Sequence, residues 1–154
     1  MFADRFPTQD GRGKLVPARI LPPDERPDAE FPFVLTTGRQ LEHWHTGAMS
    51  RRAATLDALE PAAVANVSRG TLGRLGVEPG DLVRVSTRRG SIELAVRQDD
   101  AVPDGVVFIP FAFVEAAANL LTNPALDPFG KIPEFKYCAA RIEPVTSAAR
   151  VAAE

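Results

Sequence analysis

Residues 82–97 read LVRVSTRRGSIELAVR, and this stretch predicts a β-hairpin. Apolar and polar side chains alternate through both arms, so each arm has one apolar face. The Arg88-Arg89-Gly90 segment supplies the turn, because glycine is common where antiparallel strands reverse direction. One face of the hairpin is therefore expected to be buried in a core.

Further short elements are predicted on both sides of this hairpin. Ser68 is expected to cap the N-terminus of a helical turn, and Gly76 is expected to end it. The strands are predicted at residues 33–37, 63–67, 106–109 and 137–142, and the short helices at 50–59, 68–75 and 115–121. Long amphipathic helices between the strands are missing, which argues against a doubly wound α/β sheet. A small, mainly β barrel with helical inserts fits better.

The length of 154 residues is that of one domain large enough to bury a core. We expect an extended arm over residues 1–30, a compact domain over 31–145 and a disordered tail over 146–154. Proline fixes φ and removes a backbone donor, which disfavours helix and sheet in the arm. The prolines of the arm are Pro7, Pro17, Pro22, Pro23 and Pro27.

Charge and hydropathy exclude several classes of partner. A formal net charge of -2 without a basic stripe gives no electrostatic footprint for nucleic acid. The pairs Arg51-Arg52 and Arg88-Arg89 are expected to be solvated surface. The sequence has no stretch of about 18 apolar residues, so no membrane-spanning helix is expected.

Cysteine content and the first residues bear on the compartment. The single cysteine, Cys138, lies in a predicted strand, and a buried structural thiol is favoured over a reactive one. One cysteine excludes an internal disulfide and an iron–sulfur cluster held by this chain alone. Residues 1–10 lack the apolar core of a secretory signal, so a cytoplasmic location is expected.

Polar side chains concentrate in residues 36–52, which include both histidines and the only tryptophan, in the run His43-Trp44-His45. Glycine at position 38 permits close backbone approach, and Arg39 offers a planar fork suited to pyrophosphate. Thr46 and the histidines add donors. A phosphate-bearing ligand explains this combination better than a packed surface aromatic does.

A metal site at these histidines is not expected. Alternate residues of a strand share a face, so His43 and His45 together would be a pair of ligands. The chain has no third histidine, and no carboxylate follows at a suitable spacing. Two later residues have ambiguous patterns: Asn119 suits either a helix cap or the edge of a ring, and Lys136 either solvent or a ligand.

The motifs of the chain, taken together, resemble the C-terminal molybdopterin-dinucleotide-binding domain of molybdenum and tungsten oxidoreductases. Within this superfamily the chain looks most like formate dehydrogenase large subunits, followed by periplasmic nitrate reductase. The similarity runs from about Arg5 to Pro144. It rests on Thr37-Gly38-Arg39-x-Leu41-Glu42-His43-Trp44-His45-Thr46-Gly47-x-Met49-x-Arg51-Arg52, on Ala118-Asn119-Leu120-Leu121-Thr122, on Asp127-Pro128 and on Ile132-Pro133-Glu134-Phe135-Lys136-Tyr137-Cys138-Ala139.

This resemblance implies a double-psi β-barrel, with residues 80–85 and 89–92 forming its psi-loop hairpin. It also implies the cofactor, a bis(molybdopterin guanine dinucleotide) carrying molybdenum or tungsten. Phe111 is expected to border the substrate cavity. No metal ligand and no catalytic residue is expected in this chain. The expected cofactor-binding residues are Thr37, Gly38, Arg39, His43, His45, Thr46, Asn119 and Lys136.

The resemblance places iron–sulfur ligands and catalytic residues in upstream domains. We therefore expect a fragment, an expressed domain or a separately encoded subunit, which by itself does not oxidise formate to CO2. Its expected partners are the remaining domains or a large iron–sulfur subunit. The alternatives are a stand-alone cofactor-binding or interaction module, and the same domain of a nitrate-reductase-like enzyme.

Overall fold

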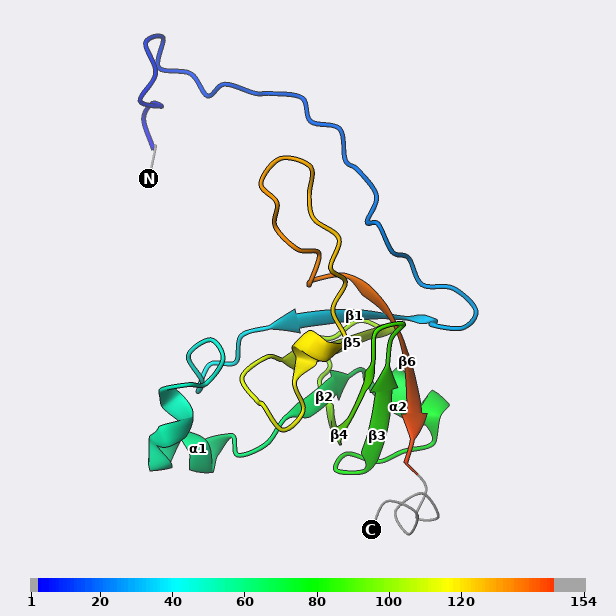
Figure 1. Ribbon diagram of the computed structural model, residues 1–154. Helices are drawn as coiled ribbons and strands as arrows, with labels where there is room; N and C mark the ends of the chain where they lie inside the picture. Colours follow the sequence, from blue (N-terminus) through cyan, green and yellow to red (C-terminus); the bar gives the residue numbers. More distant parts are fainter. Residues whose placement is uncertain (1–2, 146–154) are drawn as a thin grey trace.

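The computed structural model describes residues 3–145, which form a closed barrel of six strands (Figure 1). Around the barrel the strands follow the order β1-β5-β2-β4-β3-β6. The strands are β1 Phe33–Gly38, β2 Val64–Val67, β3 Leu82–Ser86, β4 Ser91–Gln98, β5 Val106–Pro110 and β6 Cys138–Pro144.

Two parallel pairs, β1 with β5 and β2 with β4, are joined into this ring by antiparallel pairs. The predicted hairpin is β3–β4, in which Leu82 pairs with Ala95 and Ser86 with Ser91. Short strands, crossed connections and a closed mainly β barrel confirm the predicted double-psi fold.

The interior of the barrel is apolar. Inward side chains alternate along the hairpin strands, as the burial of Val83 and Val85 in β3 and of Ile92 and Leu94 in β4 shows. Leu35, Val107 and Ile109 are fully buried on the parallel pair. Burial of this kind supplies the main driving force for folding, at roughly 25 cal/mol per Å² of apolar surface.

The described helices are short. Helix α2, Arg69–Leu75, begins after Ser68, whose side chain accepts a hydrogen bond from the Thr71 amide, and ends at Gly76 in the left-handed conformation. These caps are as predicted. The helix expected over residues 50–59 is divided into a 3-10 turn η1, Ser50–Arg52, and α1, Ala54–Leu59, because Ala53 is extended.

The helix predicted over residues 115–121 is wrong. Only a single 3-10 turn forms there, η2 at Ala118–Leu120. The buried side chains of Ala116, Ala118 and Leu121 hold the segment in an irregular path, because tertiary packing overrides the local helix propensity.

The segment before β1 and the loop over residues 122–136 both extend from one side of the barrel (Figure 1). Residues 3–32 contain no helix or strand. They meet the loop where the Asp24 amide donates to the Glu134 carboxylate at 3.1 Å. The division into arm, domain and tail stays a prediction, and the predicted tail, residues 146–154, lies outside the described residues.

Cys138, at the start of β6, is fully buried, as expected. Burial raises the pKa of its thiol. The amide of Asn123 donates to its sulfur at 3.1 Å. Within residues 3–145, no helix has the length and apolarity needed to cross a membrane.

The Ser68 cap generates a test of stability. Ser68→Ala removes the acceptor of the Thr71 amide and should lower the free energy of unfolding by about 1 kcal/mol. Chemical denaturation of the variant beside Ser91→Ala, an exposed strand serine, measures the effect. Equal stability of the two variants would contradict the capping role.

Candidate functional site

Three chain segments meet at one edge of the barrel because of how the strands pair. Strands β1 and β5 run parallel, and Gly38 lies beside Pro110, so the residues after both strands emerge together. Strand β6 runs antiparallel to β1, which brings the residues before Cys138 to the same edge. Ligands commonly bind where the carboxyl ends of parallel strands meet.

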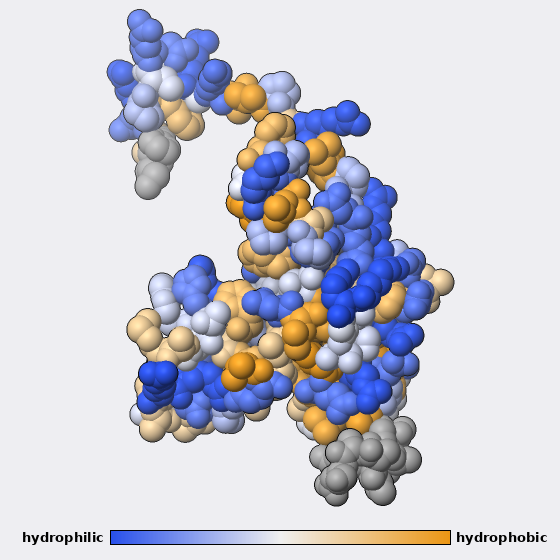
Figure 2. All heavy atoms as spheres, viewed as in Figure 1, coloured by the Kyte–Doolittle hydropathy of each residue, from blue (hydrophilic) through white to orange (hydrophobic). Residues whose placement is uncertain are grey.

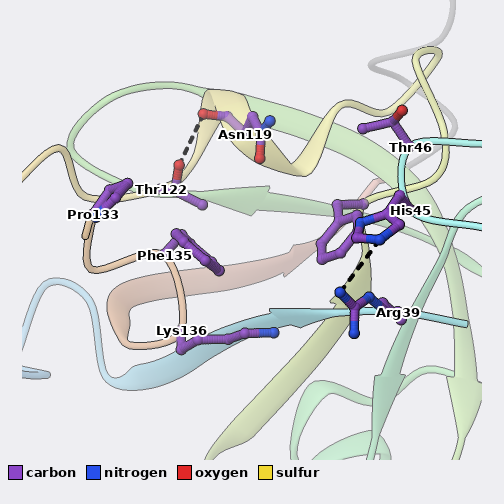
Figure 3. A pocket seen from close by; sticks show the side chains of 9 residues that line it. Arg39, His45, Thr46, Asn119, Thr122, Pro133, Phe135 and Lys136 are labelled. Carbon is purple, nitrogen blue, oxygen red and sulfur yellow. Dashed lines mark hydrogen bonds between the residues drawn. The ribbon is translucent and has the colours of Figure 1, made fainter. Parts of the chain in front are cut away.

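A cavity of about 660 Å³ lies at this edge and opens to solvent (Figure 3). Its size is in the range of small-molecule and cofactor sites. Figure 3 shows Arg39 and Lys136 along one side, with Asn119 and Thr46 on the opposite side. The described residues that line it are Arg39, His45, Thr46, Phe111, Asn119, Thr122, Pro133, Phe135 and Lys136.

The cavity suits an anion. Arg39 and Lys136 contribute two cations, and none of the described lining residues is acidic. The Lys136 ammonium donates to the Thr37 carbonyl at 2.6 Å, which directs it along β1. It also lies 5.7 Å from the centroid of the Phe111 ring. A guanidinium fork and a held ammonium are the groups that bind phosphate oxygens in proteins.

The position of His45 depends on a left-handed turn. His45 has φ 51°, a conformation that non-glycine residues rarely adopt, and Gly47 follows with φ 76°. A Cβ on Gly47 would lie 2.6 Å from the Ala112 carbonyl oxygen, so only glycine permits this approach to the segment after β5. The turn thereby brings His45 and Thr46 to the wall that contains Phe111.

Arg39 contacts His45 with 3.4 Å between Nη2 and Nε2. A guanidinium only donates hydrogen bonds, so Nε2 of His45 is the acceptor. Nδ1 of His45 has no hydrogen-bond partner among the described residues and is available to a ligand.

Two polar side chains of the cavity are free of competing hydrogen bonds among the described residues. These are the Asn119 amide and the Thr46 hydroxyl, both of which are exposed. The backbone carbonyl of Asn119 accepts a hydrogen bond from the Thr122 hydroxyl at 3.1 Å, which closes the η2 turn. The Asn119 side chain can therefore offer both a donor and an acceptor to the edge of a ring.

The structure brings together six of the nine residues predicted to touch the cofactor or to border the substrate cavity: Arg39, His45, Thr46, Phe111, Asn119 and Lys136. Thr37 does not line the cavity. It is buried, and its hydroxyl donates to the Phe135 carbonyl at 2.8 Å. Gly38 is also buried, and a Cβ there would lie 2.4 Å from the Phe108 ring. Both residues shape the barrel edge.

His43 also lies outside the cavity and is buried. Its Nε2 donates to the Glu60 carbonyl at 2.7 Å, because a carbonyl only accepts. Its Nδ1 lies 3.3 Å from the Ser50 hydroxyl, and its ring contacts the edge of Phe113. This imidazole therefore joins the segment after β1 to η1 and to the end of α1.

Three lining residues, Thr122, Pro133 and Phe135, were not among the predicted site residues. All three lie in the motifs on which the family resemblance rests, and that place was the available signal. Pro133 and Phe135 are apolar, and nothing in their pattern distinguishes a cavity wall from a core.

The expectation that the arginine pairs are solvated surface holds for Arg52 and Arg88, whose side chains are exposed, and is wrong for Arg51 and Arg89, which are half-buried. Arg51 donates to Glu115 at 2.6 Å and to Asp57 at 3.2 Å, and its guanidinium lies over the Phe113 ring. Arg88 and Arg89 both bind Glu25. Of these four arginines, only Arg52 forms no ion pair with the described residues.

The arrangement can bind a ligand that combines an anion with a flat polar ring. Cations and an imidazole N–H suit the anion, and the Asn119 amide suits the ring edge. The aromatic side chains provide flat apolar surface. Within residues 3–145, no three histidine, cysteine or acidic side chains are grouped so that they could hold a metal ion.

Comparison with known proteins agrees with this geometry. Residues 33–139 match the family model of the Molydopterin dinucleotide binding domain. The chain is 45% identical to the F420-dependent formate dehydrogenase subunit alpha of Methanocaldococcus jannaschii, over 93% of this chain and 21% of that protein. It is 38% identical to a periplasmic nitrate reductase of Desulfovibrio desulfuricans, over 77% of this chain and 16% of that protein.

A solved structure supports the fold. Acetylene hydratase from Pelobacter acetylenicus aligns with a TM-score of 0.68 and 21% identity, over 75% of this chain and 19% of that chain. At this identity the likeness concerns the fold alone.

The two histidines should differ in their effect on stability. His43→Phe fills the same space but leaves the Glu60 carbonyl without its donor and removes the contact with the Ser50 hydroxyl, which should cost about 1–3 kcal/mol. His45→Ala removes only a long, partly exposed contact and should stay within about 0.5 kcal/mol of the unchanged chain. Chemical denaturation of both variants measures this difference, and a larger loss for His45→Ala would contradict the structural assignment.

Proposed function

Because the chain belongs to the molybdopterin dinucleotide-binding domain family, we propose that it is the cofactor-binding domain of a formate dehydrogenase catalytic subunit. The chain spans about a fifth of the length of the curated formate dehydrogenase relatives it matches. The rest of such an enzyme would contain the residues that react with formate. The observation that carries the proposal is the cavity lined by two cations and no acid among its described residues.

The residues of the cavity fit a molybdopterin guanine dinucleotide. Arg39 and Lys136 lie along one side of the cavity, where both cations can bind the pyrophosphate, and Thr46 and His45 add hydrogen-bonding groups (Figure 3). Asn119 would bind the edge of the guanine through its paired donor and acceptor. When bound, the cofactor supplies a molybdenum or tungsten centre that accepts the two electrons of formate.

This chain would thus orient the cofactor and exclude water from part of it. Phe111 and Phe135 contribute apolar surface, and a lower local dielectric strengthens the hydrogen bonds beside them. Hydrogen bonds of this kind fix the geometry of a cofactor and tune its electronics. The choice between molybdenum and tungsten, and the cytoplasmic location, stay predictions.

Guanosine diphosphate contains the guanine, ribose and pyrophosphate of this cofactor, and the 154-residue chain should bind it. Arg39→Ala should weaken binding by about 10- to 100-fold, since a charge-assisted hydrogen bond contributes about 1.5–3 kcal/mol. His45→Ala should weaken it less, because one imidazole hydrogen bond is lost instead of a planar guanidinium fork. Isothermal titration calorimetry measures both effects. In the assembled enzyme the same variants should retain less molybdenum or tungsten.

Arg52→Ala is the matched control, because it removes an exposed guanidinium that does not line the cavity. It should bind guanosine diphosphate as the unchanged chain does. Equal binding by the Arg39→Ala and Arg52→Ala variants, with all chains folded by circular dichroism, would refute the site assignment.

We further propose that the partner of this domain is the remaining part of the enzyme, with its iron–sulfur clusters. Large apolar side chains of the arm and of the loop over residues 122–136 lie exposed on the same side of the barrel (Figure 2). They are Leu15, Val16, Ile20 and Leu21 in the arm, and Leu126, Phe129 and Ile132 in the loop. Exposed apolar surface of this extent is typical of protein contacts.

The arm provides a test of this partner. Ile20→Asp places a charge where the structure has an apolar side chain that is 94% exposed. It should reduce the iron that co-purifies with the tagged chain from its source cells by about tenfold or more, because burying an unpaired carboxylate is costly. Ala18→Asp adds the same charge at a neighbouring small residue and should reduce it less. Equal iron recovery for Ile20→Asp and the unchanged chain would exclude the arm from the interface.

The nitrate reductase relative supports a second reading, the same domain in an enzyme that reduces nitrate. A stand-alone binding module is the other alternative. Dye turnover of the recovered complex with formate and with nitrate distinguishes a formate dehydrogenase from a nitrate-reducing enzyme. Recovery of the chain with cofactor and without any iron would favour the stand-alone module.

A further inference from the structure

The wall of the cavity that contains Asn119 and Thr122 has little stability of its own. It consists of η2, a 3-10 helix of three residues. Its own hydrogen bonds are Leu120 to the Ala117 carbonyl and Leu121 to the Ala118 carbonyl, both at 3.0 Å. Such a short turn is held in place by its surroundings.

The tip of the β3–β4 hairpin provides that support. The Nε and Nη2 atoms of Arg89 donate to the Leu121 carbonyl at 3.2 and 3.0 Å. Gly90 packs against the same turn, since a Cβ there would lie 3.2 Å from the Leu120 carbonyl oxygen. Leu121 stands between Asn119 and Thr122, so this fork holds the backbone of the cavity wall.

Glu25, at the base of the arm, orients Arg89. Its carboxylate accepts from Nη1 of Arg89 and from Nη1 of Arg88, both at 2.8 Å, and from the Ala139 amide of β6 at 3.1 Å. The side chain is only 11% exposed. Burial raises its pKa, but the hydrogen bonds from Arg89 and Arg88 outweigh burial, so the net pKa lies below the ordinary value.

We propose that Arg89, oriented by Glu25, is a positioning residue of the cofactor cavity. Neither residue lines the cavity. Arg89 acts on a ligand through the Leu121 carbonyl and hence through Asn119. Because Glu25 belongs to the arm, the position of the arm base and the shape of the cavity are linked. The ligand part of this inference rests on the proposed function, whereas the anchoring of η2 does not.

The test uses the 154-residue chain with two readouts. The first is the dissociation constant for guanosine diphosphate, and the second is amide hydrogen exchange of residues 118–123 without ligand. Arg89→Ala should weaken binding about tenfold and accelerate exchange, because the fork to Leu121 is lost. Arg89→Lys keeps the charge beside Glu25 but has no planar fork, and should give an intermediate result. Glu25→Gln weakens the contact that orients Arg89 and should also give an intermediate result.

Two controls separate positioning from general stability. Arg84→Ala removes a guanidinium of the same hairpin that binds Glu93 through Nε and Nη2 at 3.0 and 2.6 Å. Ser68→Ala weakens the fold at the α2 cap, away from the cavity. Both should leave binding and local exchange unchanged.

The outcomes distinguish the two proposals. If the unchanged chain does not bind guanosine diphosphate, the proposed function fails, while the exchange data still test the anchor. If the unchanged chain binds and the Arg89→Ala variant binds equally well, or exchanges equally slowly over residues 118–123, the positioning role is overturned. Should the Arg89→Ala variant not fold, unchanged binding and exchange in both the Arg89→Lys and the Glu25→Gln variants overturn it.

Discussion

The parallel pairing of β1 with β5 is the constraint on which the rest of the structure depends. It places Gly38 beside Pro110, and the Phe111 amide donates to the Gly38 carbonyl at 3.1 Å. Two segments that are distant in the sequence therefore leave the barrel at one point. Thr37 holds a third segment, the residues before β6, at the same point. Its hydroxyl donates to the Phe135 carbonyl, and its own carbonyl accepts from the Lys136 ammonium. The walls that contain Arg39, Phe111, Phe135 and Lys136 follow from these few contacts.

Local signals made much of the barrel predictable. Alternation identified the hairpin, and Ser68 and Gly76 identified the ends of α2, because these features depend on residues close in sequence. The helix predicted over residues 115–121 failed for the opposite reason. Its composition favours a helix, but the segment must place Leu121 in the core while it crosses from β5 to β6.

In the cavity, too, local signals were predictable and contacts between distant residues were not. Arg39 and His45 could be named because polar groups follow a predicted strand, whereas Asn119 was named from the resemblance to the family. His43 looked equivalent to His45 in the sequence. What separates them is the left-handed turn at His45, which turns one imidazole to the cavity and leaves the other bound to Glu60. Arg51 and Arg89 likewise find carboxylates far along the chain, Glu115 and Glu25, which no local pattern reveals.

The closed ring of strands and the open arm have opposite consequences for self-association. Among the described strands the barrel leaves no edge to which another copy could add a strand. Residues 13–23 have no backbone hydrogen bonds to other described residues, so their amides could in principle template cross-β growth. Pro17, Pro22 and Pro23 interrupt this row of donors. Prolines at such positions disfavour aggregation, while the apolar side chains between them stay exposed.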